Sequence, residues 1–163
     1  MTDYFQPRSA VRALLVDEQR HSVLLIHTWV PDTDTLIWLA PGGGLDDGED
    51  ALNGLRREVY EETGLHIDQA QGPIWCRRAQ FYLHGIGYDQ SEMFYYIPVA
   101  QFDPDNSHNP AADERKIFRG FRWWSVDQIK AATDQIFVPL TLGDHLQQLF
   151  EHGLPTQPYD VGW

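Results

Sequence analysis

The order of apolar and polar positions predicts a series of short strands and two longer helices along this chain. The strand-like runs are rich in β-branched and aromatic residues, and polar or glycine-containing stretches separate them. They are residues 10–16, 23–29, 36–40, 74–83 and 93–99, with a shorter run at 121–124. The first two runs flank the polar residues 17–22, so we predict that they form a pair of strands.

The best-defined helix is predicted over residues 49–63. Glu49 and Asp50 fall in its expected first turn, where the helix dipole favours negative charge. Gly64 follows the last periodic residue and suits a left-handed cap at the C-terminal end. The apolar stripe that defines this helix recurs at helical spacing and consists of Leu52, Leu55 and Val59.

Two further helical segments are predicted in the second half of the chain. Ser125 and Gln128 form a capping-box pattern that begins a short helix. Residues 140–152 carry leucines at helical spacing, and Gly153 ends that helix. Because strands and helices interleave, we predict an α/β (α+β) fold with a central mixed sheet and helices on its faces, in one domain over residues 1–163.

The charge of the chain narrows the classes of function. It has 24 acidic and 12 basic residues, a formal net charge of −12. Non-specific binding to nucleic acid or to an anionic membrane needs Lys and Arg, so this balance argues against both partners. A phosphorylated small molecule remains compatible, because a divalent cation can reverse the local field.

Cysteine content and apolar runs bear on compartment. Cys76 is the only cysteine, which excludes an intrachain disulfide framework and a thiolate zinc site. Residues 1–17 lack the basic start and apolar run of a secretory signal. No stretch reaches the roughly 20 apolar residues that span a bilayer. We therefore expect a cytoplasmic protein with no membrane partner.

The predicted helix gathers carboxylates on one face. Each helical residue advances about 100°, so Glu58, Glu61 and Glu62 fall on neighbouring positions. A hard divalent cation removes their mutual repulsion and prefers oxygen ligands. Mg²⁺, with Mn²⁺ as a substitute, suits this set better than zinc, which normally binds His or Cys. The alternative for REVYEE taken alone is a solvated helix surface.

The spacing around the helix decides between these readings. The segment that begins at Gly43, GGLDDGEDALNGLRREVYEETGL, resembles the signature box of the Nudix (MutT-like) hydrolases at every defining position. The strand entering Pro41-Gly42-Gly43 and the Trp123-Trp124-Ser125 transition are also similar to that family. The resemblance implies a Nudix-type α/β/α sandwich with a catalytic loop-helix-loop.

The resemblance also implies hydrolysis of a nucleoside diphosphate linked to another moiety, by attack of water on phosphorus. Arg57 and Glu49 would hold the loop-helix-loop in shape. Glu61, between Arg57 and the acidic cluster, is the preferred general base. The matching positions that would supply metal-binding oxygens are the backbone of Gly42 and the side chains of Glu58, Glu61 and Glu62.

Other candidates lie outside the box. A further metal-binding carboxylate is expected from Glu114, with Glu92 as the competitor. Tyr82 lies near the position of a tyrosine in diadenosine polyphosphate hydrolases of this family, and we take it as a substrate contact. Arg77 and Arg78 are adjacent on a predicted strand and point to opposite faces, so one of them, Arg77, is a candidate phosphate contact. Solvent exposure is the alternative for Glu114 and Arg77, and a core position in an aromatic-rich strand is the alternative for Tyr82.

We therefore predict a magnesium-dependent pyrophosphohydrolase acting on a small nucleotide-like molecule. A nucleoside triphosphate or oxidised nucleotide is the first substrate hypothesis, and a dinucleoside polyphosphate or nucleotide sugar the second. The rival class is a Nudix domain kept as a non-catalytic nucleotide sensor or interaction module. The presence of Glu58, Glu61, Glu62 and Arg57 favours catalysis. A homodimer is left open.

Overall fold

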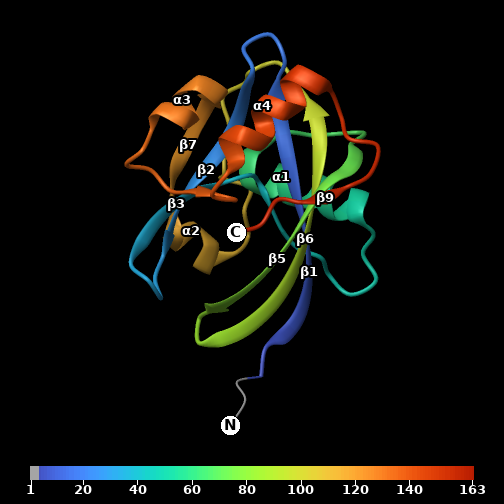
Figure 1. The fold of residues 1–163 in the computed structure, drawn as a ribbon. Coiled ribbons are helices and arrows are strands. Elements are labelled where there is room, and N and C mark those ends of the chain that lie inside the picture. The colour runs from blue at the N-terminus through green and yellow to red at the C-terminus, as the bar shows by residue number, and fades with distance from the viewer. Residues whose placement is uncertain (1–3) are drawn as a thin grey trace.

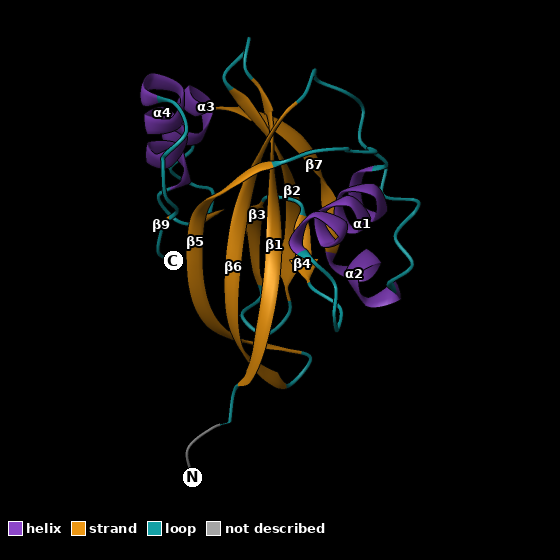
Figure 2. Cartoon of the chain, turned by 90° about the vertical axis from the view of Figure 1, so that its right-hand side faces the viewer, coloured by secondary structure: helices purple, strands orange, loops and turns teal. Residues whose placement is uncertain are grey.

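The computed structural model describes residues 4–163, so the first three residues of the predicted single domain lie outside it. Its strands belong to one mixed sheet, and Figure 2 shows α1 and α2 on one side of that sheet and α3 and α4 on the other. The strands are β1 (Gln6–Asp17), β2 (Ser22–Val30), β3 (Thr35–Leu39), β4 (Gly42–Gly44), β5 (Gln71–Leu83), β6 (Ile86–Pro98), β7 (Phe118–Ser125), β8 (Phe137–Val138) and β9 (Tyr159–Asp160). The helices are α1 (Ala51–Thr63), α2 (Ala112–Ile117), α3 (Val126–Ala131) and α4 (Leu142–His152). The predicted α+β class with a central mixed sheet is confirmed.

The central strand β1 has three neighbours in the sheet. It runs parallel to β6 from Gln6 to Val16 and antiparallel to the short strand β4. Its pairing with β2 is limited to the end of the hairpin, where Val16 faces Val23. The predicted pairing of residues 10–16 with 23–29 is therefore correct only at this end. Beyond it β2 diverges, and the glycines of β4 lie beside β1 instead.

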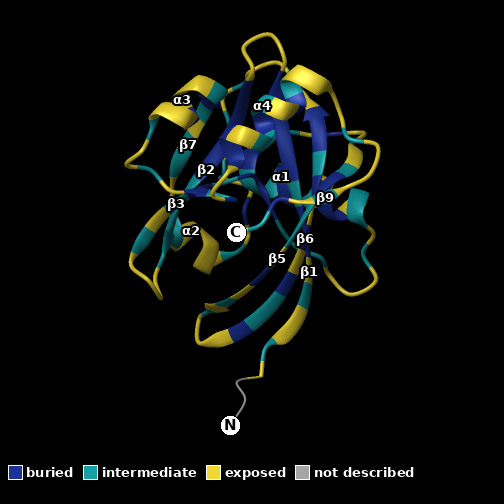
Figure 3. Cartoon of the chain, viewed as in Figure 1, coloured by how far each residue is buried: buried dark blue, intermediate teal, exposed yellow. Residues whose placement is uncertain are grey.

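Apolar side chains form one core on each face of the sheet, and β1 contributes alternately to both. Val11, Ala13 and Leu15 pack with Leu55 and Val59 of α1. On the other face Leu14 and Val16 pack in the core that α4 covers. Figure 3 shows these central parts of the strands as the most buried, whereas the far end of the β5–β6 hairpin is largely exposed.

Helix α1 differs from its prediction at one end only. Asp50 is the N-cap and accepts a hydrogen bond from the Asn53 amide, so the helix begins at Ala51. The expectation that Glu49 lies in the first turn is therefore wrong, because Glu49 precedes the cap and bonds within the loop. Gly64 has the predicted left-handed conformation, with φ 77°. The capping box of Ser125 is also present.

The pattern of apolar residues missed several elements. Strand β6 begins at Ile86, whereas the prediction began at residue 93. The apolar pattern did not detect the first half of the strand because that half is polar, and its charged side chains pair with arginines of β5. The short elements β4, α2, β8 and β9 were not predicted. Figure 1 shows the C-terminal β9 lying beside β5, far from it in sequence. Within residues 4–163, no helix has both the length and the apolar character needed to cross a membrane.

Candidate metal and substrate site

Arg57 connects helix α1 to the loop before it. Its Nε donates to Glu49 Oε2 at 2.9 Å and its Nη2 donates to Glu49 Oε1 at 2.9 Å. Nη2 also reaches the Gly44 carbonyl at 3.0 Å, and Nη1 donates to Glu58 Oε1 at 2.8 Å. The hydrogen bonds from Arg57 hold the pKa of the Glu49 carboxyl below its usual range. Arg57, on the helix, and Glu49, in the loop before it, thus join loop and helix.

The three glutamates predicted to bind metal lie on one face of α1. Glu58 is 4% exposed, and its Oε2 is buried without a hydrogen-bond partner among the described residues. Burial raises the pKa of Glu58, against the opposing effect of Arg57. Burial followed by repulsion from Glu58 raises the pKa of Glu62 well above its ordinary value. Burial also raises the pKa of Glu61, which lies 3.5 Å from Arg57 Nη1.

Gly42 meets the acidic face through its backbone. Its N–H donates to Glu62 Oε2 at 2.8 Å, and its carbonyl accepts from Arg12 Nη1 at 3.2 Å. Its φ of 147° and the close approach of the Val11 carbonyl leave no room for a side chain. The Gly42 carbonyl therefore faces a guanidinium and keeps one lone pair for another partner.

The two carboxylates considered outside the box have different surroundings. Glu114, on α2, lines the same cavity as Gly42 and Glu62, and its charge contributes to the raised pKa of all three box glutamates. It accepts a hydrogen bond from Asn109 at 2.9 Å. Glu92 instead lies between Arg12 and Arg77, and although burial opposes its ionisation these two cations lower its pKa. Glu92 is thus committed to arginines.

The donor set fits a hard divalent cation. Within residues 4–163, no group of three or more His, Cys, Asp or Glu side chains is already arranged to hold an ion. Glu62 and Glu58 are hydrogen-bonded to the Gly42 amide and to Arg57. Glu58 Oε2 nevertheless has no partner among the described residues, and burial followed by neighbouring carboxylates raises the pKa of Glu58 and of Glu62. Oxygen donors of this kind match Mg²⁺ or Mn²⁺, and carboxylate rotation would be needed to bind them.

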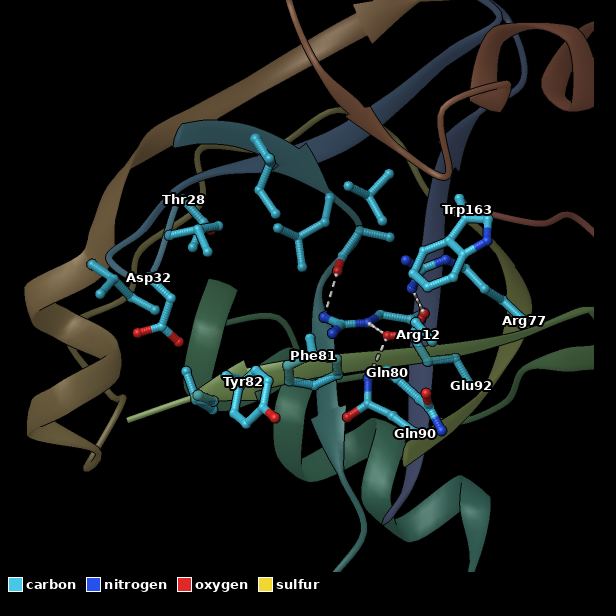
Figure 4. Close-up of a pocket in the computed structure, with 18 of the residues that line it drawn as sticks. Arg12, Thr28, Asp32, Arg77, Gln80, Phe81, Tyr82, Gln90, Glu92 and Trp163 are labelled. Carbon is cyan, nitrogen blue, oxygen red and sulfur yellow. Dashed lines mark hydrogen bonds and ion pairs between the residues drawn. The ribbon is translucent and has the colours of Figure 1, made fainter. Parts of the chain in front are cut away.

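Two adjoining cavities lie beside this acidic face. The larger one, of about 260 Å³, extends between β3, β5 and the C-terminal segment, and Figure 4 shows Arg12 at its centre with Trp163 across from Phe81 and Tyr82. The smaller one, of about 180 Å³, includes Gly42, Gly43, Glu62 and Glu114 in its wall. Both cavities are lined by Arg12, Thr28, Leu39, Phe81, Leu83, Gln90 and Ile117.

The predicted substrate contacts line the larger cavity. Arg77 is 10% exposed and donates through Nη1 to Glu92 at 2.7 Å, whereas Arg78 is 71% exposed and pairs with Asp89. The prediction that the two arginines point to opposite faces is confirmed. Tyr82 is 44% exposed at the rim of the cavity, and its ring lies 5.3 Å from that of Phe5. Contact of Arg77 or Tyr82 with a substrate stays a prediction.

Sequence reasoning missed Arg12. It donates to Glu92 Oε1 at 3.0 Å and to the carbonyls of Ala40 and Gly42, and its side chain is 14% exposed. The available signal was a single charge inside the otherwise apolar run of residues 10–16, on the face that also carries Leu14. Such a charge needs a buried partner, but the partner is Glu92, eighty residues away.

One protein family matches most of this chain, and curated relatives match parts of it. The NUDIX domain family matches residues 6–140. An RNA pyrophosphohydrolase of Sphingopyxis alaskensis is 28% identical over 108 residues, which cover 61% of this chain and 67% of that protein. An RNA pyrophosphohydrolase of Rhizobium meliloti is 44% identical over 59 residues, covering 34% of this chain and 35% of that protein. The chain thus spans between about a third and two thirds of these curated relatives.

Solved structures agree with this match. The crystal structure of a MutT protein from Methanosarcina mazei Go1 superposes with a TM-score of 0.63 and 21% sequence identity. The superposition covers 90% of this chain and 94% of that one. At this level of identity the likeness concerns the fold alone, and it agrees with the mixed sheet and four helices described above.

Proposed function

Because this chain belongs to the Nudix hydrolase family, we propose that it hydrolyses a diphosphate bond in a nucleotide-like substrate with the help of Mg²⁺ or Mn²⁺. One observation carries the proposal. Glu58, Glu61 and Glu62 share one face of α1, burial and neighbouring carboxylates raise their pKa values, and a Glu58 oxygen is buried without a partner among the described residues. A bound divalent cation would neutralise the diphosphate and lower the pKa of the attacking water.

The residues of this chain then have distinct tasks. Glu58, Glu62, the Gly42 carbonyl and Glu114 would supply oxygens for the cation. Glu61, whose side chain is 22% exposed against 6% for Glu58, would accept the proton of the attacking water. Arg57 acts through Glu49 and Gly44 by keeping the loop against the helix. The buried setting of Glu58 strengthens its attraction for a cation.

The substrate hypothesis rests on the larger cavity. Its volume of about 260 Å³ and its aromatic wall, which includes Trp29, Phe81 and Trp163, suit one flat ring system. We therefore place a nucleoside triphosphate or an oxidised nucleotide first, and a dinucleoside polyphosphate or nucleotide sugar second. A cytoplasmic location and a homodimer stay predictions from the sequence.

A second candidate is RNA, because curated relatives carry the name RNA pyrophosphohydrolase. A formal charge of −12 argues against extended contact with a polyanion. The two candidates differ in a simple respect: a mononucleotide needs only the two cavities, whereas RNA also needs a path along the surface for its following phosphates.

A substrate panel tests the proposal. The purified chain is incubated with nucleoside triphosphates, dinucleoside polyphosphates, nucleotide sugars and a triphosphorylated RNA oligonucleotide, each with Mg²⁺, with Mn²⁺ or with EDTA. Phosphorus-containing products are identified by ³¹P NMR to show which bond breaks. Metal-stimulated release from any member supports the hydrolase. Tight binding of a nucleotide without any metal-stimulated product would instead support a sensor or interaction module.

A further inference from the structure

Arg12 lies where the two cavities meet. It lines both of them, whereas Gly43, Glu62 and Glu114 line only the smaller one and Trp163 lines only the larger one. We propose that the two cavities form one continuous substrate site and that Arg12 binds the phosphate that remains attached to the ring-bearing group. This inference rests on the proposed function, because it assigns the parts of that substrate to parts of the site.

The hydrogen bonds of Arg12 leave part of its guanidinium available. Nε donates to Glu92, and Nη1 donates to the carbonyls of Ala40 and Gly42 at 3.2 Å each. Within residues 4–163, no protein acceptor is hydrogen-bonded to Nη2, and this atom is not among the buried polar atoms that lack a partner. Nη2 therefore retains donors and some exposure beside the cavities. A phosphate oxygen is an acceptor that matches such a donor.

The local charge also favours an anion. Arg12 and Arg77 bring two guanidiniums to one carboxylate, Glu92, so this buried group of three carries a formal charge of +1. The carboxylates of Glu62 and Glu58, on the acidic face, also act on Arg12 electrostatically. The side-chain amide of Gln90 donates to Glu92 Oε1, the oxygen that also accepts from Arg12, at 2.7 Å and adds no charge. Arg77 Nε is buried without a partner among the described residues. The two guanidiniums at this junction, inside a chain of net charge −12, favour a ligand that carries negative charge.

Geometry sets the order of the substrate along the site. The Gly42 carbonyl accepts from Arg12 while the Gly42 amide donates to Glu62, so one peptide segment separates the arginine from the acidic face. A phosphate at Arg12 is thus next to the metal side, and the group attached to it extends toward Phe81 and Trp163 (Figure 4). The phosphate that leaves lies on the far side, toward Glu114. The monophosphate product would therefore keep its contact with Arg12.

A binding experiment without metal tests this order. In EDTA, isothermal titration calorimetry measures the affinities of AMP, GMP, CMP and UMP and of the four matching nucleosides. The unmodified chain is expected to bind at least one monophosphate about tenfold or more tightly than its nucleoside, the effect of a charge-assisted hydrogen bond. Arg12→Gln should reduce this ratio to about one or two while the affinity for the nucleoside changes less than about threefold.

Two control variants separate a phosphate contact from a structural role. Arg78 is exposed and lies next to Arg77 on β5. Arg78→Gln removes this positive charge and should leave the ratio of the two affinities unchanged. Glu92→Gln disturbs the same buried group but keeps the Arg12 guanidinium, so the preference for the monophosphate should persist. If Arg12→Gln does not fold, Arg12→Lys decides, because it keeps the charge but loses the planar fork, and the ratio should fall about threefold or more.

Three results would overturn the inference. They are a wild-type ratio near one for all four pairs, an unchanged ratio in the Arg12 variants, and equal losses for nucleoside and monophosphate, which indicate that Arg12 only supports the backbone. Because the measurement uses no metal and no turnover, it is independent of the hydrolysis panel. A chain that shows the Arg12-dependent ratio but hydrolyses nothing contradicts the proposed function alone.

Discussion

Arg57 binds both carboxylate oxygens of Glu49 across eight residues, through Nε and Nη2, each at 2.9 Å. A planar guanidinium and a carboxylate match in this two-point geometry, which a lysine cannot reproduce. The same guanidinium also binds the Gly44 carbonyl and Glu58. One side chain, that of Arg57, therefore positions the glycine-rich loop, the residues just before helix α1 and Glu58.

The first prediction concerns this pair. Arg57→Lys should lower the free energy of unfolding by about 1–2 kcal/mol, because a partly exposed charged contact of this kind is worth that much after solvent screening. Urea denaturation followed by circular dichroism measures the change. Lys130→Gln, which removes an exposed pair with Asp144, is the control and should cost well under about 1 kcal/mol. Equal losses in the two variants would contradict the positioning role of Arg57.

The second prediction concerns the general base. Glu61→Gln keeps the shape of the side chain but removes its ability to accept a proton. Turnover of the best substrate from the panel should fall about 100-fold or more, whereas the melting temperature should stay within a few degrees. Glu151→Gln, on the exposed end of α4, is the matched control and should keep full turnover. Near-normal turnover in Glu61→Gln would remove this residue from the role.

The third prediction compares two neighbouring glycines of β4. A Cβ added at Gly43 would lie 2.7 Å from Glu58 Oε1, inside the acidic site, whereas one at Gly44 would meet the end of the flexible Arg8 side chain. Gly43→Ala should therefore weaken Mn²⁺ binding about tenfold or more, and Gly44→Ala by less than about threefold, since Arg8 can move away. Isothermal titration with Mn²⁺ measures both. The reverse order would show that Glu58 does not hold the cation.

The fourth prediction concerns pH. Burial and repulsion from Glu58 raise the pKa of Glu62, so the folded chain keeps this proton to higher pH than the unfolded chain does. Without metal, the contribution of Glu62 to stability is therefore full below the ordinary glutamate pKa and is lost as pH rises through the raised one. A cation needs the ionised carboxylate. Added Mg²⁺ should consequently raise the melting temperature more at about pH 8 than at about pH 5.5.

Differential scanning calorimetry at the two pH values checks this fourth prediction. Glu62→Gln removes the titrating group and should flatten the part of the pH dependence that belongs to it. If Mg²⁺ shifts the melting temperature equally at both pH values, or more at the lower pH, then Glu62 is not part of the cation site.

Local pattern was sufficient for helix α1 and its carboxylates. The end of the helix at Gly64 follows from a left-handed cap, and the common face of Glu58, Glu61 and Glu62 follows from helical spacing alone. Neither needs knowledge of the rest of the chain. The predicted start at residue 49 was wrong, because the side chain of Asp50 caps the helix and the helix begins at Ala51.

Pairing between distant segments was beyond the pattern. The alternation of residues 10–16 indicates a strand, but it cannot say that β1 runs parallel to β6 with Arg12 opposite Phe94. That register places Arg12 beside Glu92, which forms ion pairs with both Arg12 and Arg77. The commitment of Glu92 to arginines, which bears on the choice between Glu92 and Glu114 as a further metal-binding carboxylate, therefore depends on strand register, which sequence spacing does not contain.

By itself, the sequence determined that a capped helix presents three glutamates and an arginine behind a glycine-rich loop, because such features depend on residues within a few turns of one another. Only the tertiary structure decided which side chains surround that helix. Arg12 joins two cavities because β2 leaves β1 and the short strand β4 lies in its place. The physical reason is range: local periodicity sets the conformation of a segment, whereas strand order and register decide which distant charges meet.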